Sequence, residues 1–124
     1  MFSPNDTSNR LEKLVPKENH LVSVMEKLSR EYKIEAWDKL TPGHIHGFLV
    51  HLPNGWTVSV QFGPGNYGTN YDASFMSPPK QAWHATEAEC WAHNKDHSQH
   101  YPDNPEGWLT ISKVLLFIEE VAQK

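Results

Sequence analysis

The sequence predicts a small α+β domain in which an antiparallel sheet of about three strands packs against an N-terminal and a C-terminal helix. Two stretches, residues 18–33 and 111–123, carry apolar side chains at helical spacing. Residues 56–62 alternate apolar and polar side chains, as a strand with one buried face does. Asn54-Gly55, just before that strand, is a strong hairpin signal. We expect both helices on one face of the sheet.

The length of the chain fits one domain with one hydrophobic core. It has 124 residues, of which 38% are hydrophobic and 11% aromatic, and two separate cores would be hard to build from them. Residues 1–17 mix polar residues with prolines, so we expect a flexible N-terminal arm there and a single α+β domain over residues 18–124. The alternative is a short helical turn around residues 11–15 that packs on the core.

Both predicted helices have an N-cap candidate and one apolar stripe. Asn19 is the expected N-cap of the first helix and Thr110 that of the second. Such a stripe is more often core than a cofactor surface. The stripe residues are Leu21, Val24, Met25, Leu28 and Tyr32 in the first helix, and Ile111, Val114, Leu115, Ile118, Val121 and Ala122 in the second.

The hairpin is expected to pair residues 46–52 with residues 56–62. A type I′ turn at Asn54-Gly55 would join them, because both central positions of that turn need positive φ. The polar side of the second strand would form an exposed sheet face, lined by Thr57, Ser59 and Gln61.

A third strand is expected near residues 82–92, followed by a polar loop over residues 94–107. The strand would turn the small side chains of Ala88, Cys90 and Ala92 to one side. A short helix beginning at Glu87 is the alternative, because Ala and Glu favour helices.

Charge and cysteine content restrict the partners and the compartment. The net charge is −4 and the eleven basic residues are scattered, which argues against nucleic acid as a partner because phosphate binding needs clustered Lys and Arg. One cysteine excludes an intramolecular disulfide and fits a reducing compartment. The start resembles no signal peptide, and the apolar block 114–118 is far too short to span a bilayer. We expect a cytoplasmic protein with no membrane partner.

A glycine-rich loop after the second hairpin strand is the candidate ligand-binding site. Gly63-Pro64-Gly65-Asn66-Tyr67-Gly68 fits the letters of a dinucleotide fingerprint, but no helical pattern follows it, so we reject that interpretation. Backbone N–H groups, stacking tyrosines and amides could still bind a polar ligand. The alternative is a tight corner whose tyrosines pack on the sheet edge. The candidate residues are Gly63, Gly65, Asn66, Tyr67, Gly68, Asn70, Tyr71 and Asp72.

A histidine-rich segment provides a weaker metal-binding hypothesis. Its candidate ligands follow the spacing Cys-x₂-His-x₃-His-x₂-His, namely Cys90, His93, His97 and His100. Zinc takes such ligands, but structural zinc motifs usually contain more than one Cys. The alternative is a solvated loop, and we expect no metal and no cofactor. A small buried Cys90 and the lack of a nucleophile elbow also favour binding over catalysis.

The tryptophans allow a second kind of site. Trp37, Trp83, Trp91 and Trp108 are candidates for an interface, because Trp is enriched at binding hot spots. The alternative for each is a place in the core, since Trp is usually mostly buried.

Residues 54–67, Asn-Gly-Trp-Thr-Val-Ser-Val-Gln-Phe-Gly-Pro-Gly-Asn-Tyr, resemble a motif of small uncharacterised proteins encoded in bacteriophage genomes. Later features are similar to that family as well: Glu87 and Trp91 in a strand, Gly107-Trp108, and an amphipathic C-terminal helix. The resemblance covers about the C-terminal two thirds. This chain departs from the pattern at Gly68, where relatives often have Cys, and in its long histidine-rich loop.

The resemblance implies a phage accessory protein that acts by binding in the cytoplasm of a bacterial host. We expect it to counter a host defence system, either by engaging a host protein or by sequestering a nucleotide-like signalling molecule. A small metal-dependent enzyme that uses the segment from Cys90 to His100 is the alternative. Self-association is left open.

Overall fold

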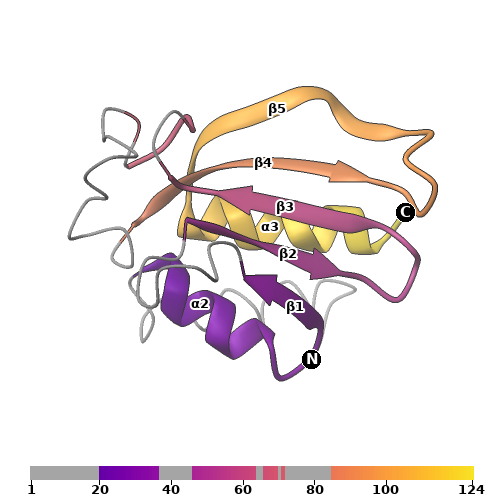
Figure 1. Ribbon diagram of the computed structural model, residues 1–124, viewed down its shortest axis with the longest axis horizontal. Helices are drawn as coiled ribbons and strands as arrows, with labels where there is room; N and C mark the ends of the chain where they lie inside the picture. Colours follow the sequence, from indigo (N-terminus) through magenta and orange to yellow (C-terminus); the bar gives the residue numbers. More distant parts are fainter. Residues whose placement is uncertain (1–19, 37–45, 64–65, 70, 72–84) are drawn as a thin grey trace, which may run out of the picture.

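The computed structural model describes residues 20–36, 46–63, 66–69, 71 and 85–124. In these residues the chain forms a five-stranded sheet and two helices (Figure 1). The elements are α2 (Leu21–Leu28), β1 (Lys33–Ala36), β2 (Gly47–His51), β3 (Thr57–Gln61), β4 (Glu87–His93), β5 (His100–Thr110) and α3 (Ile111–Ala122).

The strands follow one another across the sheet in the order β1-β2-β3-β4-β5, and every neighbouring pair is antiparallel. Val60 pairs with both Phe48 and Cys90, so these three side chains share one face. All three are fully buried. Ser59 pairs with Leu49 and Trp91 on the opposite face, where the side chains are half-buried. The sheet therefore has one core face and one polar face.

One hydrophobic core lies between the core face of the sheet and the helices. Helix α3 runs behind β3, β4 and β5 (Figure 1) and contacts all three strands. Helix α2 adds its buried stripe to the same core, and its first residue, Leu21, donates from N to the carbonyl oxygen of Ala85 at 2.7 Å. The two helices thus hold the sheet in place from its apolar side.

The α+β class is confirmed, but the expected number of about three strands is wrong. The third expected strand exists as Glu87–His93; residues 82–84 lie outside the described residues. Strand β1 was missed because its four residues, Lys-Ile-Glu-Ala, follow directly on the pattern of the first helix. Strand β5 was missed because its sequence has the composition of a polar loop and mostly exposed side chains.

The hairpin is confirmed, with His51 opposite Thr57 and Gly47 opposite Gln61. The type I′ turn is wrong, because Gly55 alone has positive φ (90°) in this turn. Gly55 N donates to Leu52 O at 3.1 Å and Leu52 N donates to Trp56 O at 2.8 Å. These bonds close a three-residue loop, for which one residue in the left-handed region is enough.

Helix boundaries differ from the expected ones mainly in the first helix. Its end moves from residue 33 to Leu28, because the chain turns after Ser29 and enters β1. Its N-cap is His20, whose ring accepts from Ser23 N, and Asn19 lies outside the described residues. Helix α3 begins after Thr110 as predicted.

Replacing Thr110 with alanine should lower the free energy of unfolding by about 1 kcal/mol. The Thr110 hydroxyl accepts a hydrogen bond from Lys113 N at 3.4 Å, and the helix loses that cap in the variant. Urea unfolding followed by circular dichroism measures the change. Serine at the same position keeps the acceptor and serves as the control, so an equal loss in both variants would contradict a capping role.

Residues 1–17, the expected flexible arm, lie outside the described residues. Within the residues that are described, neither helix is long and apolar enough to cross a membrane.

Candidate functional site

The glycine-rich loop leaves β3 and returns to the same end of the sheet, where it docks on β4 and β5 (Figure 1). Five of its eight candidate residues are described, namely Gly63, Asn66, Tyr67, Gly68 and Tyr71. The other three, Gly65, Asn70 and Asp72, lie outside the described residues.

Asn66 fixes the first half of the loop. Its Oδ1 accepts from Gly63 N at 3.2 Å, and its Nδ2 donates to Gln61 Oε1 at 2.9 Å and to Glu89 Oε1 at 3.3 Å. The side chain is half-buried. Because both ends of the amide are engaged within the chain, Asn66 acts here as a brace that positions the loop.

The second half of the loop docks on the start of β4. Thr69 N donates to Glu87 O at 3.2 Å, and Thr69 Oγ1 accepts from Glu87 N at 2.9 Å and from Thr86 N at 3.1 Å. Gly68 is buried, and a Cβ built on it would lie 2.9 Å from the Glu87 carbonyl carbon and 3.1 Å from Ala88 Cα. Only glycine lets the loop come this close to the strand.

Strand β5 supplies the other support of the loop. Trp108 N donates to Tyr67 O at 2.8 Å. A Cβ built on Gly107 would lie 2.5 Å from Tyr67 Cβ, so the Tyr67 side chain occupies the space left by the missing methyl group. Residues far apart in the sequence are brought together because β5 returns beside β4.

Three exposed aromatic rings gather where the loop meets β5; we call Tyr67, Tyr71 and Trp108 the aromatic cluster. The Tyr67 ring stacks on Tyr71 with centroids 5.2 Å apart and on Trp108 with centroids 6.3 Å apart. Tyr71 and Trp108 lie 5.9 Å apart. The exposed fractions are 48%, 40% and 51%. The rings support one another while leaving about half of their surface to solvent, which is unusual for residues of this size.

The backbone of Trp108 has an unfavourable conformation. Its φ is 56°, a value that bulky residues adopt rarely and at a cost. Such strain tends to persist where function requires a side chain to point in a particular direction. The sequence marked Trp108 as an interface candidate, but it did not join Trp108 to the tyrosines. That link depends on the pairing of β5, which the sequence pattern did not show.

The other interface tryptophans are less exposed or not described. Trp91 is half-buried on the polar face and donates from Nε1 to Pro102 O at 2.6 Å. Trp37 and Trp83 lie outside the described residues. Of the predicted polar-face residues, Thr57 is 7% exposed, and Ser59 and Gln61 are half-buried.

The electrostatic surroundings of the loop are acidic. Both charged residues that hydrogen-bond to it in the described part of the chain are carboxylates: Glu89 through its side chain and Glu87 through its backbone. Both side chains are half-buried on the polar face of β4. A ligand that approaches the loop from the polar face of β4 therefore meets negative charge.

The structure does not bring together the four candidate metal ligands. Cys90 points into the core and is fully buried, whereas His93 lies on the opposite face of β4. Burial, reinforced by the Glu106 and Glu89 carboxylates, raises the pKa of the Cys90 thiol far above its usual range. Among the described residues, no group of three or more His, Cys, Asp or Glu side chains is arranged to hold a metal ion.

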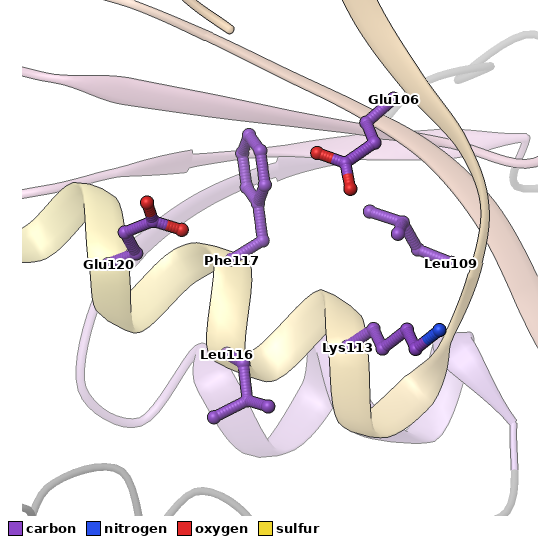
Figure 2. A pocket seen from close by; sticks show the side chains of 6 residues that line it. All are labelled: Glu106, Leu109, Lys113, Leu116, Phe117 and Glu120. Atoms are coloured by element: carbon purple, nitrogen blue, oxygen red, sulfur yellow. The ribbon is translucent and has the colours of Figure 1, made fainter.

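A small cavity of about 170 Å³ lies between β5 and α3 (Figure 2). Glu106 and Phe117 face each other across it, and Leu116 points away. The Tyr101 hydroxyl donates to Glu120 beside this cavity, and that hydrogen bond raises the pKa of Tyr101. The cavity is too small for most organic ligands, which usually occupy several hundred Å³. It contributes no second site.

Comparisons of the chain with protein-family models, with curated proteins and with solved structures gave no match. The resemblance to bacteriophage proteins stays a prediction from the motif in residues 54–67.

Proposed function

We propose that this protein is a non-catalytic binding protein that engages a partner protein through its aromatic cluster. The observation that carries the proposal is the stack of three exposed rings, Tyr67, Tyr71 and Trp108. Tyrosine and tryptophan dominate binding hot spots because they bury a large area with little loss of conformational entropy. A stack that is assembled before binding lowers that entropy cost further.

The charge around the cluster favours a partner that presents Arg or Lys. A cation over the face of a tryptophan or tyrosine ring is attracted by the electrons of the ring. Glu87 and Glu89 lie beside the docked loop, and their negative charge also attracts a cation. The same carboxylates would repel the phosphates of a nucleotide. We therefore place a basic side chain of a protein, rather than a nucleotide-like signal, at the cluster.

The resemblance to phage-encoded proteins gives the proposal its biological setting. The partner is then a bacterial host protein, and binding would interfere with a host defence system. Occlusion of a functional surface is enough for this, and no catalytic step is required.

Replacing Trp108 with alanine should weaken binding of the partner by about 30-fold or more, as expected for the loss of a hot-spot side chain worth about 2 kcal/mol or more. The partner is first captured from bacterial lysate and identified by mass spectrometry. Its affinity for the wild-type protein and for each variant is then measured by calorimetry with purified components. Leu116→Ala is the matched control, because Leu116 is a large exposed side chain (42%) on helix α3, away from the loop.

Unchanged affinity of the Trp108→Ala variant would refute the proposal. A second titration, with adenosine monophosphate, distinguishes the ligand classes. If the wild-type protein and Leu116→Ala bind it and Trp108→Ala does not, the cluster is a nucleotide site and the protein partner is the wrong conclusion.

A further inference from the structure

A second cavity, of about 490 Å³, lies at the end of the sheet opposite to the aromatic cluster. It is lined by residues of the β2–β3 turn and of the β4–β5 turn, and both turns lie at the same end of the sheet (Figure 1). The register explains why both turns lie at this end, because Thr57 pairs with both His51 and His93 here. Its volume is that of a site for a small organic molecule.

The lining of this cavity carries histidine and lysine side chains on one side and apolar side chains on the other. His51, His93, Lys95 and His97 line one side with nitrogen-bearing side chains, and Leu52 and Trp56 contribute an apolar wall. No carboxylate belongs to the lining among the described residues. With His counted as neutral, Lys95 is the one described lining residue that carries a formal charge, and this positive charge favours a ligand that carries negative charge.

Hydrogen bonds hold the backbone of the β4–β5 turn, which carries Lys95 and His97. Asn94 N donates to Gln99 O at 3.1 Å, and Gln99 N donates to Asn94 Oδ1 at 3.0 Å. His97 N donates to Asn94 O at 3.1 Å. These three hydrogen bonds order the backbone of the turn before a ligand binds, which lowers the part of the entropy cost that the backbone contributes.

His97 carries a second mark of a functional position. Its φ is 61°, in the left-handed region, and its ring stacks on His93 with centroids 3.8 Å apart and planes 18° apart. His93 Nδ1 donates to Asn94 O at 3.0 Å, which orients the stacked pair. Backbone strain at an oriented side chain is typical of binding sites.

The acidic groups nearest to the cavity already have partners. Asp96 Oδ1 accepts from Ser98 N at 3.1 Å, and hydrogen bonds to Ser98 lower the pKa of Asp96, which is therefore ionised at neutral pH. Glu35 Oε1 lies 2.5 Å from His51 Nε2. His51 is thus paired, and Lys95 and His97 are the donors left for a ligand. Lys95 makes no ion pair among the described residues.

We propose that this cavity binds a small organic anion, a phosphate monoester or a carboxylate joined to a flat apolar group. Lys95 and His97 hold the anionic group, and the apolar group rests against Leu52 and Trp56. The site is independent of the aromatic cluster, which lies at the other end of the strands.

Calorimetric titrations of the full chain at pH 7 with phenyl phosphate and with benzoate test this proposal and distinguish the two anions. Inorganic phosphate and phenol, each alone, should bind at least about ten-fold more weakly than the joined molecule, because each makes only half of the contacts. No binding of either joined probe at about 10 mM, roughly ten times a millimolar Kd, would overturn the proposal.

Two variants locate the binding. Lys95→Ala and His97→Asn should each weaken it about ten-fold, the usual consequence of losing one hydrogen bond to a charged group. Asparagine tolerates positive φ, so His97→Asn keeps the turn while it removes the imidazole. Lys113→Ala is the control of equal charge on α3, and Trp108→Ala should also bind normally. Equal loss in Lys95→Ala and Lys113→Ala would reduce the effect to net charge and refute the site.

Discussion

Replacing Phe48 with alanine is expected to lower the free energy of unfolding by about 3–5 kcal/mol. Phe48 lies on the core face of β2 and is fully buried. Its ring packs edge to face on Phe62, with centroids 6.2 Å apart and an interplanar angle of 63°. This geometry stabilises the folded state beyond what burial of the apolar area alone contributes. Alanine leaves a cavity in the middle of the sheet, where neighbouring strands cannot move inward to fill it.

Urea unfolding, followed by far-ultraviolet circular dichroism, measures this loss. Leu49→Ala is the matched control, because Leu49 is the next residue of the same strand and lies half-buried on the polar face. It should lose no more than about 1.5 kcal/mol, in line with partial burial. Domains of this size are stable by only about 5–15 kcal/mol, so the Phe48→Ala variant should approach the limit of folding. Similar losses in the two variants would contradict a one-sided core.

The parts of the fold that the sequence predicted are those in which local pattern and tertiary packing agree. Residues 56–62 alternate between apolar and polar side chains because one side of β3 faces the core. Thr110 was predictable as the N-cap of α3 because a cap depends only on residues next to it in the sequence. The hairpin could also be predicted from the sequence, but the type of its turn could not. Pro53 before Asn54-Gly55 favours a turn in which the first positions have negative φ, and Gly55 alone then takes the positive value.

Strands β1 and β5 could not be predicted in this way. Strand β5 contains Pro102 and Pro105, its pairing with β4 is interrupted by register shifts, and most of its side chains are exposed. It is an edge strand, which tolerates prolines and needs no alternating pattern. Strand β1 lies at the other edge and has only four residues. The sequence thus showed the centre of the sheet and missed both edges.

The candidate site was predictable to the same extent as the strands around it. The glycines and tyrosines of the loop marked it from sequence alone, because they are rare in such density. Trp108 could not be assigned to it without β5, and Asn66 was assigned to a ligand although the structure uses its amide to brace the loop. Gly68 was assigned to ligand approach, whereas in the structure it makes close contact with β4.

Replacing Gly68 with alanine should therefore remove binding at the aromatic cluster by displacing the loop. The added methyl group would collide with the Glu87 carbonyl group and lie 3.1 Å from Ala88 Cα, all of them backbone atoms of a paired strand. Overpacking of this kind costs about 1–3 kcal/mol, and the loop can avoid the cost by moving away from the strand. The hydrogen bonds of Thr69 to Glu87 and of Trp108 to Tyr67 would then break.

Once the loop has moved, Tyr67 and Tyr71 no longer stack beside Trp108, so all three rings lose their common arrangement. We expect partner affinity to fall about 100-fold or more, beyond the loss from Trp108→Ala, because several hot-spot contacts disappear together. Thr86→Ala is the matched control, since Thr86 is exposed next to Glu87 and, among the residues that the structure describes, contacts the loop through its backbone N–H, which the substitution keeps. Hydrogen exchange should show faster exchange at Thr69 N and Trp108 N in Gly68→Ala, while amides of β2 and β3 stay protected.

If the Thr69 and Trp108 amides stayed protected and the partner still bound normally, strand β4 would have moved to accommodate the methyl group and the loop would have kept its position. Close packing of Gly68 on β4 would then not be what places the rings.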